Sequence, residues 1–99
     1  MDIQMKDDGR KGQFFIESDG SVVAETTYVW AGQHKIIIDH AVVDKSSQGK
    51  NLGKQLVNRA ILFAREKFLK ILPLCPFAAA IFAKTPDYED VYLRYEGLD

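Results

Sequence analysis

Residues 35–57 read KIIIDHAVVDKSSQGKNLGKQLV, and within them the residue pattern changes from that of a strand to that of a helix. Residues 35–43 are apolar at both odd-numbered and even-numbered positions, which is typical of a central strand buried on two sides. From Leu52 onward, apolar residues recur at intervals of three and four, as they do along one face of a helix. The segment SSQGKNLGK at residues 46–54 is therefore predicted to lead from a buried strand into a long helix.

This loop has the composition of an anion site. The first N–H groups of a helix lack intrahelical acceptors, and the positive end of the helix dipole favours a negative ligand. Gly49 and Gly53 allow a ligand to approach the backbone closely, and Lys50 and Lys54 add positive charge. The short glycine spacing and Gln55 exclude a Walker loop, and without a GxGxxG pattern a dinucleotide fold is disfavoured. The residues alone leave two interpretations open, a phosphate loop and an ordinary glycine turn with solvated lysines.

The flanking sequence completes an α+β pattern around this junction. Before it, residues 13–17 and 22–30 favour strands that short turns join into an antiparallel meander. After it, residues 52–68 predict a long helix, residues 70–75 a short strand, and residues 76–84 a second helix that begins at a proline. A strand–helix–strand unit usually pairs its strands in parallel through a right-handed crossover. The order β-β-β-α-β-α therefore predicts a mixed sheet.

The length of 99 residues predicts one folded unit. We expect a flexible N-terminus at residues 1–12, because this segment is polar and contains glycine. A single domain should follow at residues 13–99. Its tail, near residues 89–95, should either add a last short strand or lie over the core.

The composition argues against several classes of function. The formal net charge is −1, so the chain lacks the positive field expected of a nucleic-acid binder. No apolar run reaches the roughly 18 residues of a membrane span, and the polar N-terminus does not resemble a signal peptide. We therefore expect a cytoplasmic protein without nucleic-acid or membrane partners, as a monomer or weak dimer. One cysteine and two badly spaced histidines predict neither an internal disulfide nor a bound metal.

Two residues outside the loop are candidate catalytic groups. Cys75 lies where a strand ends and a helix begins, an edge where α/β sheets place their ligands and where the helix dipole favours a thiolate. The alternative is a small buried hydrophobic residue, which is how most free cysteines behave. His40 lies in the apolar strand, on the predicted face of Ile36, Ile38 and Val42. It is interpreted as a satisfied core histidine or as a proton shuttle.

Three blocks of sequence together resemble one known family. They are IDHAVV at 38–43, QGKNLGKQLV at 48–57 and LKILPLCPFAAAIFAKTPDYEDV at 69–91, which contains an LCPF motif. In this order and spacing they resemble a family of short single-domain proteins within the GNAT acetyltransferase superfamily, over residues 14–92. The resemblance implies a GNAT-like mixed sheet and an acetyl-CoA-dependent N-acetyltransferase that acts on an unknown amine, either directly or through Cys75. The alternative is a coenzyme A-binding or acyl-CoA-binding module without catalysis.

The resemblance also implies where the coenzyme lies. The diphosphate would rest on the loop and first helical turn, and the pantetheine arm would follow the end of the preceding strand towards Cys75. The residues implied as coenzyme contacts are Val42, Val43, Gln48, Gly49, Lys50, Asn51, Leu52, Gly53, Lys54, Phe77 and Lys84. Backbone N–H groups near Val42 and Val43 would polarise the thioester carbonyl.

The chain departs from the family pattern in three respects. Asn51 stands where the loop usually has glycine, although asparagine tolerates a left-handed backbone better than most residues. The family often has His-Thr-Glu-Val where this chain has HAVV at residues 40–43, so a hydroxyl and a carboxylate are missing. Helices that grip the acceptor in larger members are also missing, which implies an open acceptor groove. All three departures favour the non-catalytic alternative.

Overall fold

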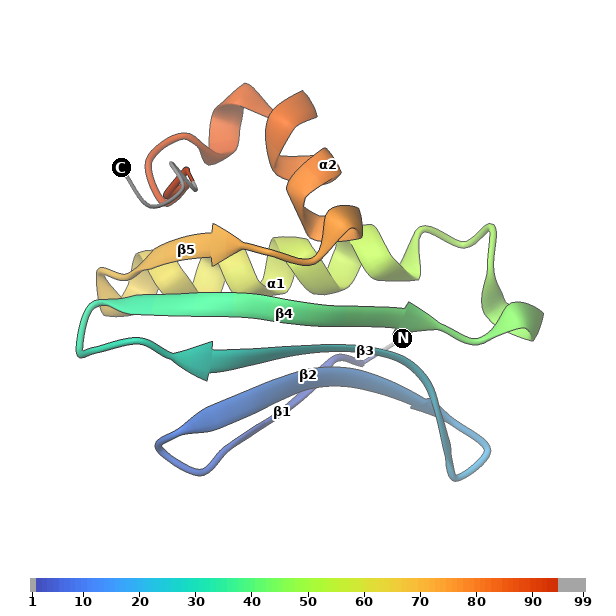
Figure 1. The fold of residues 1–99 in the computed structure, drawn as a ribbon. Coiled ribbons are helices and arrows are strands. Elements are labelled where there is room, and N and C mark those ends of the chain that lie inside the picture. Colours follow the sequence, from blue (N-terminus) through green and yellow to red (C-terminus); the bar gives the residue numbers. More distant parts are fainter. Residues whose placement is uncertain (1, 95–99) are drawn as a thin grey trace.

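A mixed sheet with helices packed against it forms the fold of residues 2–94, which the computed structural model describes (Figure 1). In these residues the sheet has five strands in chain order: β1 (Gln4–Asp7), β2 (Lys11–Ser18), β3 (Ser21–Trp30), β4 (Lys35–Val43) and β5 (Lys70–Pro73). The first four strands pair antiparallel, and β5 pairs parallel to β4. Helix α1 (Leu52–Lys67) connects β4 to β5, and helix α2 (Pro76–Lys84) follows β5. Short 3-10 turns lie at Lys45–Ser47 and Pro86–Tyr88. The predicted mixed α+β fold is confirmed.

The core lies between α1 and the sheet face that it covers. Alternation along β3 buries Ala24, Thr26 and Tyr28 on this face. Two adjacent rows of apolar side chains on α1 are buried against them, namely Leu52, Leu56, Val57, Ala60, Ile61, Phe63 and Ala64. This one-sided burial orients α1 and thereby places its first turn at the C-terminal end of β4.

The N-terminal segment differs from the loose end that its composition predicted. Residues Gln4–Asp7 form the edge strand β1, which pairs antiparallel with β2 and places Met5 opposite Phe14. The strand is mostly exposed, so its sequence QMKD lacks the apolar alternation by which strands are recognised. At the other end, residues 95–99 of the predicted domain lie outside the described residues.

A hydrogen-bond network joins β1 to the core. The buried Tyr28 hydroxyl and the Trp30 indole N–H both donate to the Asp7 carboxylate, the latter over 2.9 Å, and the Gly9 N–H donates over 2.7 Å. Burial disfavours the charged form of Asp7, but these hydrogen bonds outweigh it and hold its pKa below the usual value. For Tyr28, burial and the hydrogen bond to Asp7 raise the pKa. The network therefore holds the buried ring of Tyr28 in one place.

Strand β4 is not buried on both faces, which corrects the sequence-based prediction. Its pairing with β3 places Thr27 opposite His40 and Tyr28 opposite Ile38, so Asp39 is an extra residue that forms a β-bulge. Ile38 points into the core, whereas Asp39 and His40 are both exposed on the outer face. After the bulge, Ala41 returns to the inner face. The bulge thus reverses the alternation on which the predicted face of His40 depended.

The tail of the chain lies beside β5. The Ile71 N–H donates to the Val91 carbonyl over 2.7 Å, and the Leu93 N–H donates to the Ile71 carbonyl over 2.8 Å. Asp90 forms an ion pair with Arg65 of α1 over 2.9 Å. The tail therefore covers part of the outer edge of β5, and it joins that edge to α1. Within residues 2–94 no helix has the length and apolar character needed to cross a membrane.

Candidate functional site

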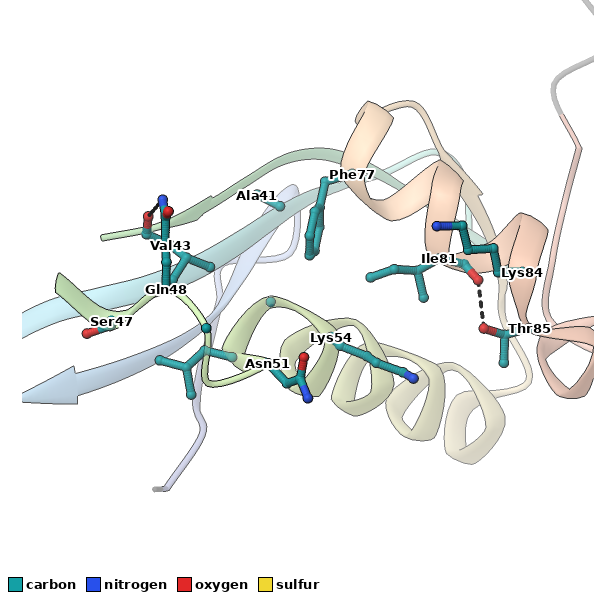
Figure 2. Close-up of a pocket in the computed structure, with 13 residues that line it drawn as sticks. Ala41, Val43, Ser47, Gln48, Asn51, Lys54, Phe77, Ile81, Lys84 and Thr85 are labelled. Atoms are coloured by element: carbon teal, nitrogen blue, oxygen red, sulfur yellow. Dashed lines mark hydrogen bonds between the residues drawn. The ribbon is translucent and has the colours of Figure 1, made fainter. Parts of the chain in front are cut away.

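A cleft of about 540 Å³ opens where β4 and β5 diverge (Figure 2). Strand β5 ends at Pro73, which pairs with Ile38, whereas β4 continues to Val43. Beyond this point β4 has no strand on its β5 side, and the cleft is bordered by the start of α1 and by α2. The cleft therefore lies at the carboxyl ends of the parallel strand pair, where α/β sheets commonly bind their ligands.

The floor of the cleft exposes backbone groups of β4. The Asp44 N–H donates to the Val23 carbonyl on β3 over 2.7 Å. Because neighbouring residues of a strand direct their N–H groups to opposite sides, those of Val43 and Ala41 point away from β3 and into the gap beyond β5. The Val43 carbonyl accepts a hydrogen bond from the Gln48 side chain over 3.3 Å. Ala41 and Val43 both line the cleft, whereas the Val42 side chain is exposed on the opposite face.

The loop before α1 is shaped by two left-handed residues. Gly49 has a φ of 89°, and Asn51, the N-cap of α1, has a φ of 58°. Asparagine is among the few side chains that adopt this conformation readily, so the loop keeps a left-handed turn here without a glycine. The Asn51 side chain makes no capping hydrogen bond, and its carbonyl accepts from the Gln55 N–H over 3.0 Å. The chain thus turns sharply into α1 without covering the helix N-terminus.

The N–H groups of the first turn of α1 face this cleft without internal partners. An α-helix provides no acceptor for its first N–H groups, and no described residue accepts from those of Leu52, Gly53 or Lys54. All three residues line the cleft. Together with the helix dipole they form a site suited to an anion such as a phosphate.

The ring of Phe77 on α2 packs directly on the backbone of Gly53. A Cβ atom at Gly53 would lie 2.5 Å from Cζ of Phe77 and 2.6 Å from its Cε2. Phe77 is nevertheless 44% exposed, and its ring lines the cleft between Ala41 and the first turn of α1 (Figure 2). Glycine at position 53 thus leaves the space that the Phe77 ring occupies against the first turn of α1.

The charge of the cleft is positive. Lys54 from α1 and Lys84 from α2 both line it, whereas none of its described lining residues is an aspartate or a glutamate. Neither lysine forms an ion pair with any residue in the described part of the chain. Both side chains are exposed, so the positive charge lies at the rim of the cleft rather than on its floor.

The structure brings together most of the residues implied as coenzyme contacts, and it leaves some outside. Val43, Phe77, Lys84 and the loop residues 48–54 apart from Lys50 line the cleft. Four further residues line the cleft that the sequence did not predict: Ala41, Ser47, Ile81 and Thr85. Ala41 was missed because the bulge that turns it inward leaves no clear mark in the sequence. Ile81 could have been found, because it lies one helical turn after Phe77 on the same face of α2.

The two candidate catalytic side chains do not line the cleft. Cys75 is the N-cap of α2, is 8% exposed and belongs to the hydrophobic core. His40 is exposed on the outer face of the sheet, where it borders a shallow hollow with Glu25, Val42 and Asp44. Cys75 therefore lies just after the end of β5, and His40 lies beside the bulge of β4. Neither side chain lies in the cleft itself.

Comparison with known proteins agrees with this architecture. A GCN5-like protein from Staphylococcus aureus, solved by NMR, is 33% identical with a TM-score of 0.70, and the match covers 94% of this chain and 90% of that chain. A GNAT family acetyltransferase from Elizabethkingia anophelis with acetyl-CoA bound is 15% identical with a TM-score of 0.60, covering 76% and 52%. GCN5 from Tetrahymena is 16% identical with a TM-score of 0.64, covering 91% and 65%. The last two comparisons show a shared fold.

The sequence comparisons are narrower than the structural ones. None of the curated proteins matches the chain in sequence. A family model described as GCN5-related N-acetyl-transferase matches residues 13–91, which include the whole cleft. With this match and the 33% identity to the Staphylococcus protein, the chain belongs to the GCN5-related N-acetyltransferase family.

Proposed function

We propose that this chain transfers an acetyl group from acetyl-CoA, bound in the cleft, to an amine. One observation carries the proposal: the same cleft presents free N–H groups of the first turn of α1, which suit a diphosphate, and of β4, which suit a thioester carbonyl. Lys54 and Lys84 add the positive charge that a phosphorylated donor needs. The family match supports the choice of reaction, and acetyl-CoA bound to the Elizabethkingia protein supports the choice of donor.

The cleft suggests how its own residues would act. The diphosphate would accept hydrogen bonds from the N–H groups of Leu52, Gly53 and Lys54, and the apolar arm would lie against Val43 and Phe77. The thioester carbonyl would accept from the β4 backbone, and these donors would also stabilise the oxyanion that develops during attack. The amine nitrogen would attack the carbonyl carbon, the carbon–sulfur bond would break, and the thiolate would leave as free coenzyme A.

The amine would react in its uncharged form. None of the described cleft-lining residues is a histidine or a carboxylate that could remove a proton from an ammonium group. The proton released when the nitrogen acylates would pass to solvent through the open side of the cleft. This assignment gives no role to His40, which lies on the opposite face of the sheet.

A non-catalytic coenzyme A-binding module is the second candidate, and the lack of a general base among the described lining residues favours it. A cleft whose described lining residues provide no general base can bind an acyl-CoA without turning it over. The two candidates share the donor site and differ only in whether an acceptor reacts. They are therefore separated by measuring binding and turnover on the same sample.

The test is calorimetric titration with acetyl-CoA, followed by a turnover assay with a panel of amines that includes lysine peptides and polyamines. We expect saturable binding, and release of free coenzyme A that rises with pH towards the pKa of the amine. Binding without turnover across the whole panel would favour the module. No binding of acetyl-CoA or coenzyme A would reject both candidates.

Replacing Cys75 distinguishes direct transfer from transfer through the thiol. Because Cys75 lies in the core and outside the cleft lining, we expect direct transfer. Cys75→Ala should therefore keep turnover within ~3-fold of wild type, whereas loss of a covalent nucleophile typically lowers it by orders of magnitude. The readouts are the turnover rate and intact mass after mixing with acetyl-CoA.

An acetylated wild-type chain that is absent from the Cys75→Ala and Cys75→Ser variants, together with loss of turnover, would instead support the covalent route. The melting temperature of each variant separates this result from damage to the core.

A further inference from the structure

The cleft runs from a half-buried apolar floor to an exposed cationic rim. Ala41, Val43 and Ile81 line its floor and are half-buried, whereas Lys54 and Lys84 are exposed. The two lysines come from different helices, and in Figure 2 they lie on α1 and α2 with Ile81 between them. A ligand that fits this cleft therefore has an apolar arm at one end and a highly charged group at the other.

The rim holds a lysine from α2, which is not the helix whose N-terminus suits the diphosphate. The diphosphate already has the free N–H groups of the first turn of α1 as donors. Lys84 belongs to the other helix, seven residues after Phe77, and it has no ion-pair partner among the described residues. An unpaired lysine that faces a cleft with no described carboxylate in its lining is suited to a second anionic group on the same ligand.

We propose that Lys84, assisted by Lys54, binds the 3′-phosphate of coenzyme A, so that the chain selects the complete coenzyme over dephospho-coenzyme A. The proposal rests on the proposed function, because it assumes that the donor occupies this cleft with its thioester at β4. The charged nucleotide end then lies at the solvent-exposed rim. A phosphomonoester there carries nearly two negative charges near neutral pH and attracts both ammonium groups.

The experiment compares how tightly two donors bind to wild type, to variants of the two rim lysines and to a control variant. Acetyl-CoA and its 3′-dephospho form are titrated into wild type, Lys84→Gln and Lys54→Gln by calorimetry. The matched control is Lys67→Gln, which removes the same charge at the far end of α1, away from the cleft. Lys84→Arg preserves the charge and should preserve the preference. Melting temperatures report whether each variant remains folded.

We expect wild type to bind acetyl-CoA ~10-fold more tightly than the dephospho form, since one charge-assisted contact is worth about this factor. Lys84→Gln should reduce the preference to ~2-fold by weakening only the binding of acetyl-CoA, and Lys54→Gln should have a smaller effect. The preference should also shrink as salt is added, because exposed charges are screened. Lys67→Gln should keep the wild-type preference.

Equal binding of both donors by wild type would overturn this inference and leave the proposed function intact. An equal loss for both donors in Lys84→Gln would also overturn it, because the lysine would then act through its general field. If wild type binds neither donor, the proposed function fails as well.

Discussion

Replacing Lys54 with glutamate should abolish acetyl-CoA binding without destabilising the fold. Lys54 lies in the first turn of α1 and lines the cleft beside the free N–H groups of Leu52 and Gly53. A carboxylate there would accept hydrogen bonds from these N–H groups and would repel a phosphate. We therefore expect acetyl-CoA to bind ~100-fold more weakly or worse. Isothermal calorimetry measures this loss.

The stability of Lys54→Glu should not fall with its affinity for acetyl-CoA. The first turn of α1 contains no acidic residue, and its N-cap makes no side-chain hydrogen bond. A glutamate at this position is attracted by the positive end of the helix dipole. This attraction typically stabilises a helix by about 0.3–1 kcal/mol. The melting temperature of Lys54→Glu should therefore equal or exceed that of wild type.

The matched control is Lys67→Glu, at the C-terminal end of the same helix. It changes the net charge by the same amount, but it lies outside the cleft and at the negative end of the dipole. It should leave acetyl-CoA binding unchanged and lower stability slightly. If Lys54→Glu binds acetyl-CoA as wild type does, the anion site is not at the start of α1. If both variants lose binding equally, the effect is one of overall charge.

Replacing Gly12 with alanine should lower the stability of the fold more than the substitutions in the cleft do. Gly12 is buried in β2, and a Cβ atom there would lie 2.2 Å from both Cζ and Oη of Tyr28. The ring of Tyr28 has no room to move, because it packs 5.5 Å from Phe14 and 5.9 Å from Phe63, measured between ring centroids. Its hydroxyl is also bound to Asp7.

The overlap must therefore be relieved by moving the backbone of β2 or breaking the network at Asp7. We expect a loss of about 3 kcal/mol or more of unfolding free energy, at the upper end of overpacking effects. Domains of this size have only about 5–15 kcal/mol in total. Urea denaturation measures the loss, with Gln13→Ala as a neighbouring variant whose half-buried side chain points to the other face.

A second background tests the steric explanation. In Tyr28→Leu the ring is absent, so adding Gly12→Ala should cost much less than it does in wild type. Additive effects of the two substitutions would mean that Gly12 and Tyr28 do not compete for the same space. A wild-type stability for Gly12→Ala would show that the ring lies elsewhere.

Local patterns predicted most elements of the fold. Alternation along β3 and the helical repeat of α1 were sufficient, because each element hides a single face and side-chain periodicity records that face directly. The edge strand β1 could not be predicted, because its side chains are exposed and only pairing with β2 defines it. The same reason explains why the face of His40 was wrongly predicted: the bulge at Asp39 is a property of the pairing with β3.

The loop into α1 follows from its own residues. Gly49 and Asn51 are residues that tolerate positive φ, and the start of a helix has free N–H groups whatever packs around it, so the candidate anion site was already visible in residues 48–54. Which other residues line the same cleft depends on how distant segments pack together. Ala41 enters the cleft through the bulge, Lys84 reaches it from α2, and Cys75 is buried in the core. These placements depend on the register between strands and on the packing of α2 against Gly53, and such contacts between distant segments leave no period in the sequence.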